Sequence, residues 1–156
     1  MNMSQQTKFA VAPDIKMKYC LYARKSTESD ERQALSIDSQ VKEMLQIAER
    51  ENLDIVDIRR ESKSAKDSDK RPVFKELIRD ISEERFNAIL TWAPDRLSRN
   101  AGDLGSLVDL MDTKKLLSIR TYGQTFSNSP NEKFLLMILC SQAKLENDNR
   151  GINVKR

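Results

Sequence analysis

The chain has 156 residues, of which 38% are hydrophobic and 33% charged, and its formal net charge is +3. These values predict one folded, soluble domain, and the charge is too small to indicate a nucleic-acid partner by itself. The longest apolar run, Phe134 to Leu139, is far shorter than the roughly 18 residues of a membrane-spanning helix. Residues 1–6 are polar and begin no signal peptide, so we expect a cytoplasmic protein without a membrane partner.

The chain contains no histidine. Triads that use histidine, histidine metal ligands and imidazole acid–base chemistry are therefore excluded. The two cysteines, Cys20 and Cys140, stand in apolar stretches without a CxxC spacing, which predicts reduced thiols in the core. Arginine, lysine, carboxylate, serine and tyrosine side chains remain for catalysis.

The first half of the chain alternates between strand and helix patterns. After a loose extension, residues 18–24 read as a strand, residues 53–58 as a second strand, and residues 62–71 as a polar loop. Ser36 is suited to cap a first helix, and Pro72 to begin a second. The expected buried stripes of these helices are Ile37, Val41, Met44, Leu45 and Ala48, then Phe74, Leu77, Ile78 and Ile81.

The alternation continues with a strand over residues 86–92, a helix and a fourth strand over residues 116–122. The apolar positions of that helix are Leu104, Leu107, Val108 and Met111. We therefore expect an α/β fold of three layers, with a mainly parallel central sheet flanked by helices. Ligand sites of such sheets gather at the carboxyl ends of the strands, where Ser26 and Arg96 both lie.

The last element is a helix that begins with a capping box formed by Ser129 and Glu132, with Pro130 in its first turn. Six consecutive apolar residues of this helix cover its whole circumference. This pattern predicts that a second surface buries the side of the helix that a first packing surface leaves uncovered. A partner subunit could supply this surface, or the helix could be sunk deep within its own domain.

Several residues suit the cutting of a phosphodiester by an enzyme hydroxyl. This reaction needs a serine close to the phosphate and cations that stabilise the charged transition state. Arginine suits the second task, because its planar fork donates to two phosphate oxygens and stays charged. The candidates are Ser26 with Arg24, Arg96 and Arg99, which lie at or beyond the carboxyl ends of strands, and Arg71 before a helix.

Four segments of the chain resemble the motifs of the serine recombinases, which include resolvases, DNA invertases and large serine integrases. Tyr22 to Ser26 resembles the Y-x-R-x-S motif, and Ser36 to Gln40 resembles the S-x-x-x-Q sequence that opens the first helix. Arg71 to Phe74 is similar to the RPG-type segment, and Asp95 to Arg99 is similar to the DRLxR signature, the most specific of the four. The long spacing between Ser26 and Gln40 is similar to that of the large serine recombinase and transposon recombinase branch.

The resemblance implies that Ser26 is the nucleophile and that Arg24, Arg71, Arg96 and Arg99 bind and activate the phosphate. It implies supporting or DNA-binding roles for Tyr22, Gln40, Asp95, Lys144 and Arg150. In the implied reaction Ser26 attacks phosphorus, displaces a 3′-hydroxyl and holds the 5′-phosphate as a phosphoserine ester until strand exchange and religation. The family needs neither ATP nor a metal, so no cofactor is expected.

The chain is expected to divide into a loose extension (residues 1–16), a catalytic domain (17–128) and a long C-terminal helix (129–156). By resemblance this helix dimerises the subunits, lies across DNA and begins the linker to a DNA-binding domain. The expected partners are recombination-site DNA and further copies of the chain, as a homodimer and as a tetramer in the synaptic complex. Asn147 stands where many relatives carry an arginine, and Arg150 is the expected substitute.

Two other functions fit parts of this pattern. A non-catalytic module of the same fold would only dimerise or regulate an intact recombinase. A flavodoxin-like nucleotide binder would show the same alternation, but it needs a glycine-rich phosphate loop, and the chain has only four glycines.

Overall fold

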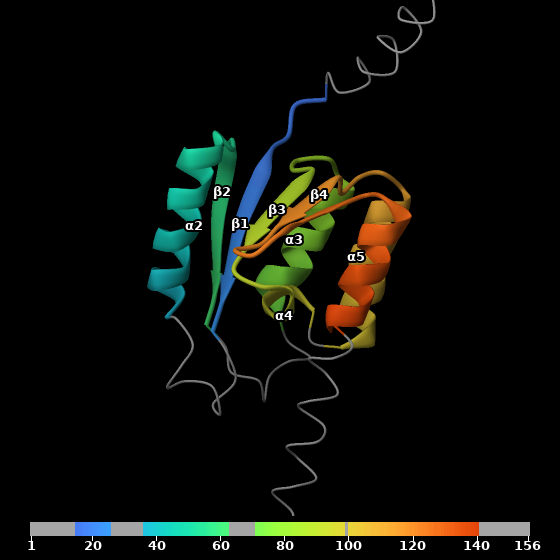
Figure 1. The fold of residues 1–156 in the computed structure, drawn as a ribbon. Helices are drawn as coiled ribbons and strands as arrows, with labels where there is room; N and C mark the ends of the chain where they lie inside the picture. Colours follow the sequence, from blue (N-terminus) through green and yellow to red (C-terminus); the bar gives the residue numbers. More distant parts are fainter. Residues whose placement is uncertain (1–14, 26–35, 63–70, 99, 141–156) are drawn as a thin grey trace, which may run out of the picture.

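The structure, a computed structural model, describes residues 15–25, 36–62, 71–98 and 100–140 (Figure 1). Strands and helices alternate along the chain as the sequence predicts. The elements are β1 (Tyr19–Arg24), α2 (Ile37–Glu51), β2 (Ile55–Glu61), α3 (Pro72–Ser82), β3 (Ala88–Thr91), α4 (Pro94–Leu97), α5 (Ala101–Asp112), β4 (Ser118–Arg120) and β5 (Thr125–Ser127). Residues 130–140 are also helical.

The strands form one sheet in the order β2-β1-β3-β4-β5. The pairs β1·β2, β1·β3 and β3·β4 are parallel, and β5 runs antiparallel to β4, so the predicted mainly parallel sheet is confirmed. Strand β5 has no counterpart among the elements predicted from the sequence. It has three residues, of which only Phe126 is buried, and so it carries too little apolar pattern to be recognised.

Helices cover both faces of the sheet and form the three predicted layers (Figure 1). Successive side chains of β1 point to opposite faces, as in any strand. Leu21 and Ala23 pack against α2, whereas Cys20 and Tyr22 belong to the larger core cluster that includes residues of α3, α5 and the helix of residues 130–140. The parallel arrangement brings the carboxyl ends of β1, β2 and β3 to one edge of the sheet.

Ser36 begins α2 as predicted, because its Oγ accepts a hydrogen bond of 3.1 Å from the Ser39 N–H. The buried stripe is Gln40, Val41, Met44, Ile47 and Ala48. The prediction that Leu45 lies in the core was wrong, because Leu45 is 38% exposed at the flank of the stripe. Ile47 takes the core position.

Strand β2 starts and ends later than predicted, and it reaches Glu61. Among the described strands it lies at the edge of the sheet and pairs with β1 alone, and Val56 on it is 49% exposed. The second half of β2 is polar. Within it, Arg59 forms ion pairs with Asp57 and Asp80. The longer strand carries Glu61 to the same sheet edge as Arg24, its register partner on β1.

The helix of residues 130–140 follows the predicted N-cap Ser129, but only half of the predicted capping box forms, because the Glu132 carboxylate accepts from the Ser127 N–H in place of the Ser129 N–H. The Glu132 N–H donates to Ser129 Oγ (3.3 Å), and the Glu132 carboxylate accepts from the Ser127 N–H (2.9 Å). Leu136 and Cys140 are buried. The exposed apolar residues are Phe134, Leu135, Met137 and Ile138. The helix is therefore not buried on all sides by its own domain.

Within the described part of the chain, no helix is long and apolar enough to cross a membrane.

Candidate active site

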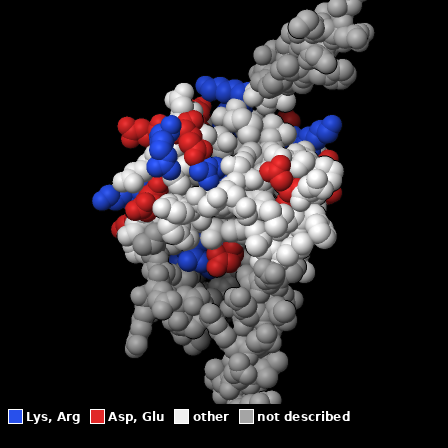
Figure 2. Space-filling view, in the orientation of Figure 1, with Lys and Arg blue, Asp and Glu red and all other residues white. Residues whose placement is uncertain are grey.

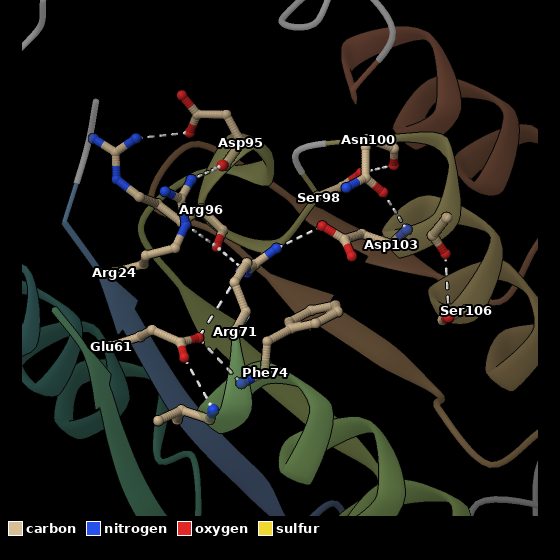
Figure 3. A network of polar contacts seen from close by, with 12 residues as sticks. Arg24, Glu61, Arg71, Phe74, Asp95, Arg96, Ser98, Asn100, Asp103 and Ser106 are labelled. Carbon is tan, nitrogen blue, oxygen red and sulfur yellow. Dashed lines mark hydrogen bonds and ion pairs between the residues drawn. The ribbon is translucent and has the colours of Figure 1, made fainter. Parts of the chain in front are cut away.

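Three arginines meet at the carboxyl edge of the parallel strands (Figure 3). Arg24 is the last residue of β1, Arg96 lies in α4 directly beyond β3, and Arg71 precedes α3. All three are buried, with exposed fractions of 4 to 7%. Since a buried guanidinium stays charged, each needs partners, and their partners define the site.

Arg24 ties β1 to α4. Its Nε donates to the carbonyl oxygen of Arg96 (3.0 Å), and its Nη2 donates to the carbonyl oxygen of Asp95. Gln40, fully buried on α2, donates from Nε2 to the Arg24 carbonyl (3.0 Å). Arg24 and Gln40 therefore fix the end of β1 relative to both α2 and α4.

The short helix α4 presents Arg96. Pro94 starts it after an extended Ala93, and the helix ends at Leu97, which is buried in the larger core cluster. Arg96 Nη1 lies 3.1 Å from Asp95 Oδ1, while its buried Nε has no hydrogen-bond partner among the described residues. A buried cationic donor without a partner is uncommon in native structures, and it is suited to a ligand oxygen.

Arg71 holds four elements together. Its Nη1 pairs with Asp103 Oδ2 on α5 (2.6 Å), and its Nη2 donates to the Tyr22 hydroxyl on β1 (3.0 Å) and to the Arg96 carbonyl (3.2 Å). Its guanidinium lies over the ring of Phe74 in α3, 4.1 Å from the centroid. The carbonyl of Arg96 thus accepts from both Arg24 and Arg71.

Two carboxylates of the site were not predicted. Glu61 is 2% exposed and accepts hydrogen bonds from the Tyr22 hydroxyl (2.5 Å) and from the N–H groups of Val73 (2.9 Å) and Phe74 (3.1 Å). The strand-end rule that selected Arg96 would have found Glu61, had the predicted strand not ended at residue 58. Asp103 follows its N-cap, Asn100, by three residues. No sequence signal connects Asp103 to Arg71.

The site contains buried groups with altered acidity. Burial raises the pKa of the Tyr22 hydroxyl, although the Arg71 charge opposes this shift. Tyr22 is therefore a neutral hydrogen-bonding group, which donates to Glu61 and accepts from Arg71. Close by, burial raises the pKa of the Cys140 thiol to about 11, while a hydrogen bond with Ser98 lowers it in part. The structure confirms that both cysteines are free and buried.

The structure brings together six of the predicted site residues: Tyr22, Arg24, Gln40, Arg71, Asp95 and Arg96. Four others lie outside the described residues: Ser26, Arg99, Lys144 and Arg150. The arrangement can hold an anion against several guanidinium groups at a sheet edge. Ser26 follows Arg24 by two residues in the sequence.

Comparisons with known proteins identify a matching family and similar folds. Residues 19–156 match the family model of the resolvase N-terminal domain. The N-terminal catalytic domain of TP901-1 integrase is similar in structure, with a TM-score of 0.62, 25% identity, and coverage of 84% of this chain and 97% of that chain.

Two more distant structures share the fold. A resolvase family site-specific recombinase from Streptococcus pneumoniae has a TM-score of 0.60 at 22% identity, with coverage of 90% of this chain and 94% of that one. The C-terminal catalytic domain of ISC1926 TnpA, an IS607-like serine recombinase, has a TM-score of 0.51 at 16% identity, with coverage of 67% and 70%.

Proposed function

Because the chain belongs to the resolvase family and is the catalytic domain of a serine-type site-specific DNA recombinase, we propose that Ser26 is its nucleophile. We assign the binding of the scissile phosphate to Arg24, Arg71, Arg96 and Arg99. The observation that carries the proposal is the shared carbonyl of Arg96, which accepts from both Arg24 and Arg71. These contacts hold α4 against the strand that leads to Ser26.

The proposed reaction is a transesterification. The Oγ of Ser26 forms a bond to phosphorus, the bond from phosphorus to the 3′-oxygen breaks, and the serine proton leaves through a base while the 3′-oxygen gains a proton. The phosphoserine ester conserves the bond energy, and the reverse steps rejoin the strands. The guanidinium groups stabilise the negative charge that develops on the phosphate oxygens.

The described residues suggest different tasks for the arginines. The side chain of Arg96 pairs with the half-exposed carboxylate of Asp95, and its buried Nε, like that of Arg71, has no hydrogen-bond partner among the described residues, so we assign Arg96 a direct contact with the phosphate. Arg71 donates to Asp103, Tyr22 and Arg96, and these contacts favour a role in shaping the site as well as in neutralising charge. Gln40 and Asp95 support the same edge.

We also propose that the helix of residues 130–140 joins two copies of the chain, and that two such dimers form the tetrameric synaptic complex. Charged side chains are frequent around α2 in Figure 2, whereas the surface over α5 and the final described helix is mainly uncharged. Phe134, the most exposed apolar residue of that helix, is 63% exposed. We further propose that the protein acts in the cytoplasm, and that Lys144 and Arg150, later in the sequence, add contacts with DNA phosphates.

A test of the nucleophile does not require a defined recombination site. The complete gene product is incubated with sheared genomic DNA from its source organism, denatured in detergent, and the covalently held 5′ ends are sequenced. Wild type and the control Ser106→Ala, an exposed serine on α5, should give the same adduct at a few junctions. Ser26→Ala should give none, and an adduct that survives this change would overturn the assignment.

A further inference from the structure

Glu61 makes more contacts within the site than the proposed reaction uses. It ends β2, is 2% exposed, and receives three donors on its two carboxylate oxygens. The Tyr22 hydroxyl and the Phe74 N–H reach Oε1, and the Val73 N–H reaches Oε2. Hydrogen bonds to a buried carboxylate are among the stronger ones in proteins.

Two of these contacts cap α3. The residue at the N-cap position is Arg71, whose side chain makes no capping hydrogen bond. The free N–H groups of the first turn therefore need another acceptor, and a carboxylate is favourable at this positive end of the helix. Glu61 supplies it from the neighbouring strand, and the Arg71 side chain is free to enter the site.

The third contact, from Tyr22, fixes the direction of the hydroxyl proton of this tyrosine. Tyr22 has one O–H donor, which points to Glu61, so its lone pairs face Arg71 Nη2 at 3.0 Å. If the hydroxyl turned its proton toward Arg71, donor would face donor. Glu61 Oε1 also lies 3.8 Å from Arg71 Nε, which partly balances the buried charge.

We propose that Glu61 is a positioning residue of the active site, which caps α3 from β2 and orients the Tyr22 hydroxyl, and through these contacts sets the orientation of Arg71. The inference rests on the proposed function for its catalytic consequence. Its structural part, the dependence of Arg71 on Glu61, stands apart from any reaction.

Glu61→Gln is the informative variant. Glutamine has one oxygen, and its NH₂ group would face at least one of the three donors, so the variant keeps the size of the side chain and breaks the pattern of hydrogen bonds. Glu76→Gln is the matched control, because Glu76 lies on α3 with a side chain 56% exposed and loses the same charge. Tyr22→Phe removes the hydroxyl and leaves the cap of α3 in place.

The first measurement is solvent exchange of the Arg71 guanidinium protons by ¹⁵N NMR on the complete gene product. Loss of a hydrogen-bond partner should speed this exchange roughly tenfold or more in Glu61→Gln, and Tyr22→Phe should show part of the effect. Glu76→Gln should match wild type. Unchanged exchange in both Glu61→Gln and Tyr22→Phe overturns the proposal, whether or not the protein cleaves DNA.

The second measurement is single-turnover cleavage of the duplex recovered in the adduct experiment. Glu61→Gln should slow cleavage on the order of a hundredfold, the effect of a small misplacement of a catalytic group, with DNA affinity changed by less than about threefold. In an Arg71→Ala background, Glu61→Gln should cause no further loss. Independent, additive losses would show that Glu61 does not act through Arg71. Failure of the wild type to form any adduct would instead count against the proposed function.

Discussion

At the scale of single residues, the site is a cluster in which carboxylates set the positions of arginines. Arg71 is 5% exposed on its side chain and pairs with Asp103, which is 19% exposed. Breaking a buried pair costs more than forming it gains, because the remaining charge stays unpaired. Here Glu61, near Arg71 Nε, limits that cost.

Asp103→Asn should therefore destabilise the protein without unfolding it. We expect a loss of about 1.5–3 kcal/mol in the free energy of unfolding, the range for a hydrogen bond to a charged group. Urea denaturation measures this free energy of unfolding. Asp109→Asn, an exposed change on the same helix, should stay within about 0.5 kcal/mol of wild type. Equal effects of the two substitutions would mean that the contact between Arg71 and Asp103 contributes nothing to stability.

The cysteines give a second prediction at this scale. Burial raises the pKa of Cys20 to about 12 and that of Cys140 to about 11, so both are protonated thiols at pH 8. Iodoacetamide at pH 8 should modify neither in the native protein and both in urea, as read by mass spectrometry. Rapid modification of native Cys140 would show that the helix of residues 130–140 separates from the core.

At the scale of elements, the start of the final described helix is held by hydrogen bonds of Glu132 with Ser127 and Ser129. The hydrogen bond from the Ser127 hydroxyl holds the pKa of the Glu132 carboxyl below its usual range, helped by the Ser127 N–H and by Ser129. A lowered pKa means that the ionised form is favoured in the folded state. Its stabilisation is present above the unfolded pKa and is lost as the pH falls through the folded value.

Acidification should thus loosen the start of this helix. Below pH about 4.3, the usual pKa of a glutamate, the amide of Ser127 should lose its hydrogen bond to Glu132 and shift in an NMR titration. Glu132→Gln should show no such transition. A Ser127 shift that persists in the variant would assign the transition to another group.

The place of each strand in the sheet also explains how accurately the sequence predicted its ends. Strands β1 and β3 are buried throughout and mainly apolar, so their carboxyl ends were predicted to within one residue, and with them the positions of Arg24 and Arg96. Strand β2 lies at an edge, and its polar second half is held by ion pairs such as that of Arg59 with Asp80, so no apolar pattern marked its true end at Glu61. The contact of Asp103 with Arg71 depends on the packing of α5 beside α3, which local patterns do not determine.

At the scale of the whole molecule, a cluster of exposed apolar side chains stands out among the described residues. It consists of Phe134, Leu135, Met137 and Ile138 on the final described helix. Beside it, Met137 and α5 line a shallow depression of about 360 Å³, whose lining includes Leu104 and Val108 and also Asp109 and Asp112. Exposed apolar surface of this kind marks an interface, and the proposed dimer would bury it.

Phe134→Glu should weaken this association. Because burial of a phenylalanine side chain contributes about 1.5–3 kcal/mol, the dissociation constant should rise at least roughly tenfold. Sedimentation velocity over a concentration series measures it. Gln46→Glu adds a negative charge at an exposed position of α2, which covers the other face of the sheet, and should leave association unchanged. Equal association of wild type and Phe134→Glu would exclude this surface from the interface.

The central claim is that Ser26 becomes covalently joined to DNA, and the most direct measurement is the chemical identity of that link. The trapped adduct is digested with nuclease and trypsin, and the modified peptide is sequenced by mass spectrometry. We predict a 5′-nucleotide phosphate on the Oγ of Ser26 and a free 3′-hydroxyl on the other DNA end. A phosphate on any other residue, or a DNA end with a 3′-phosphate link, would contradict the account.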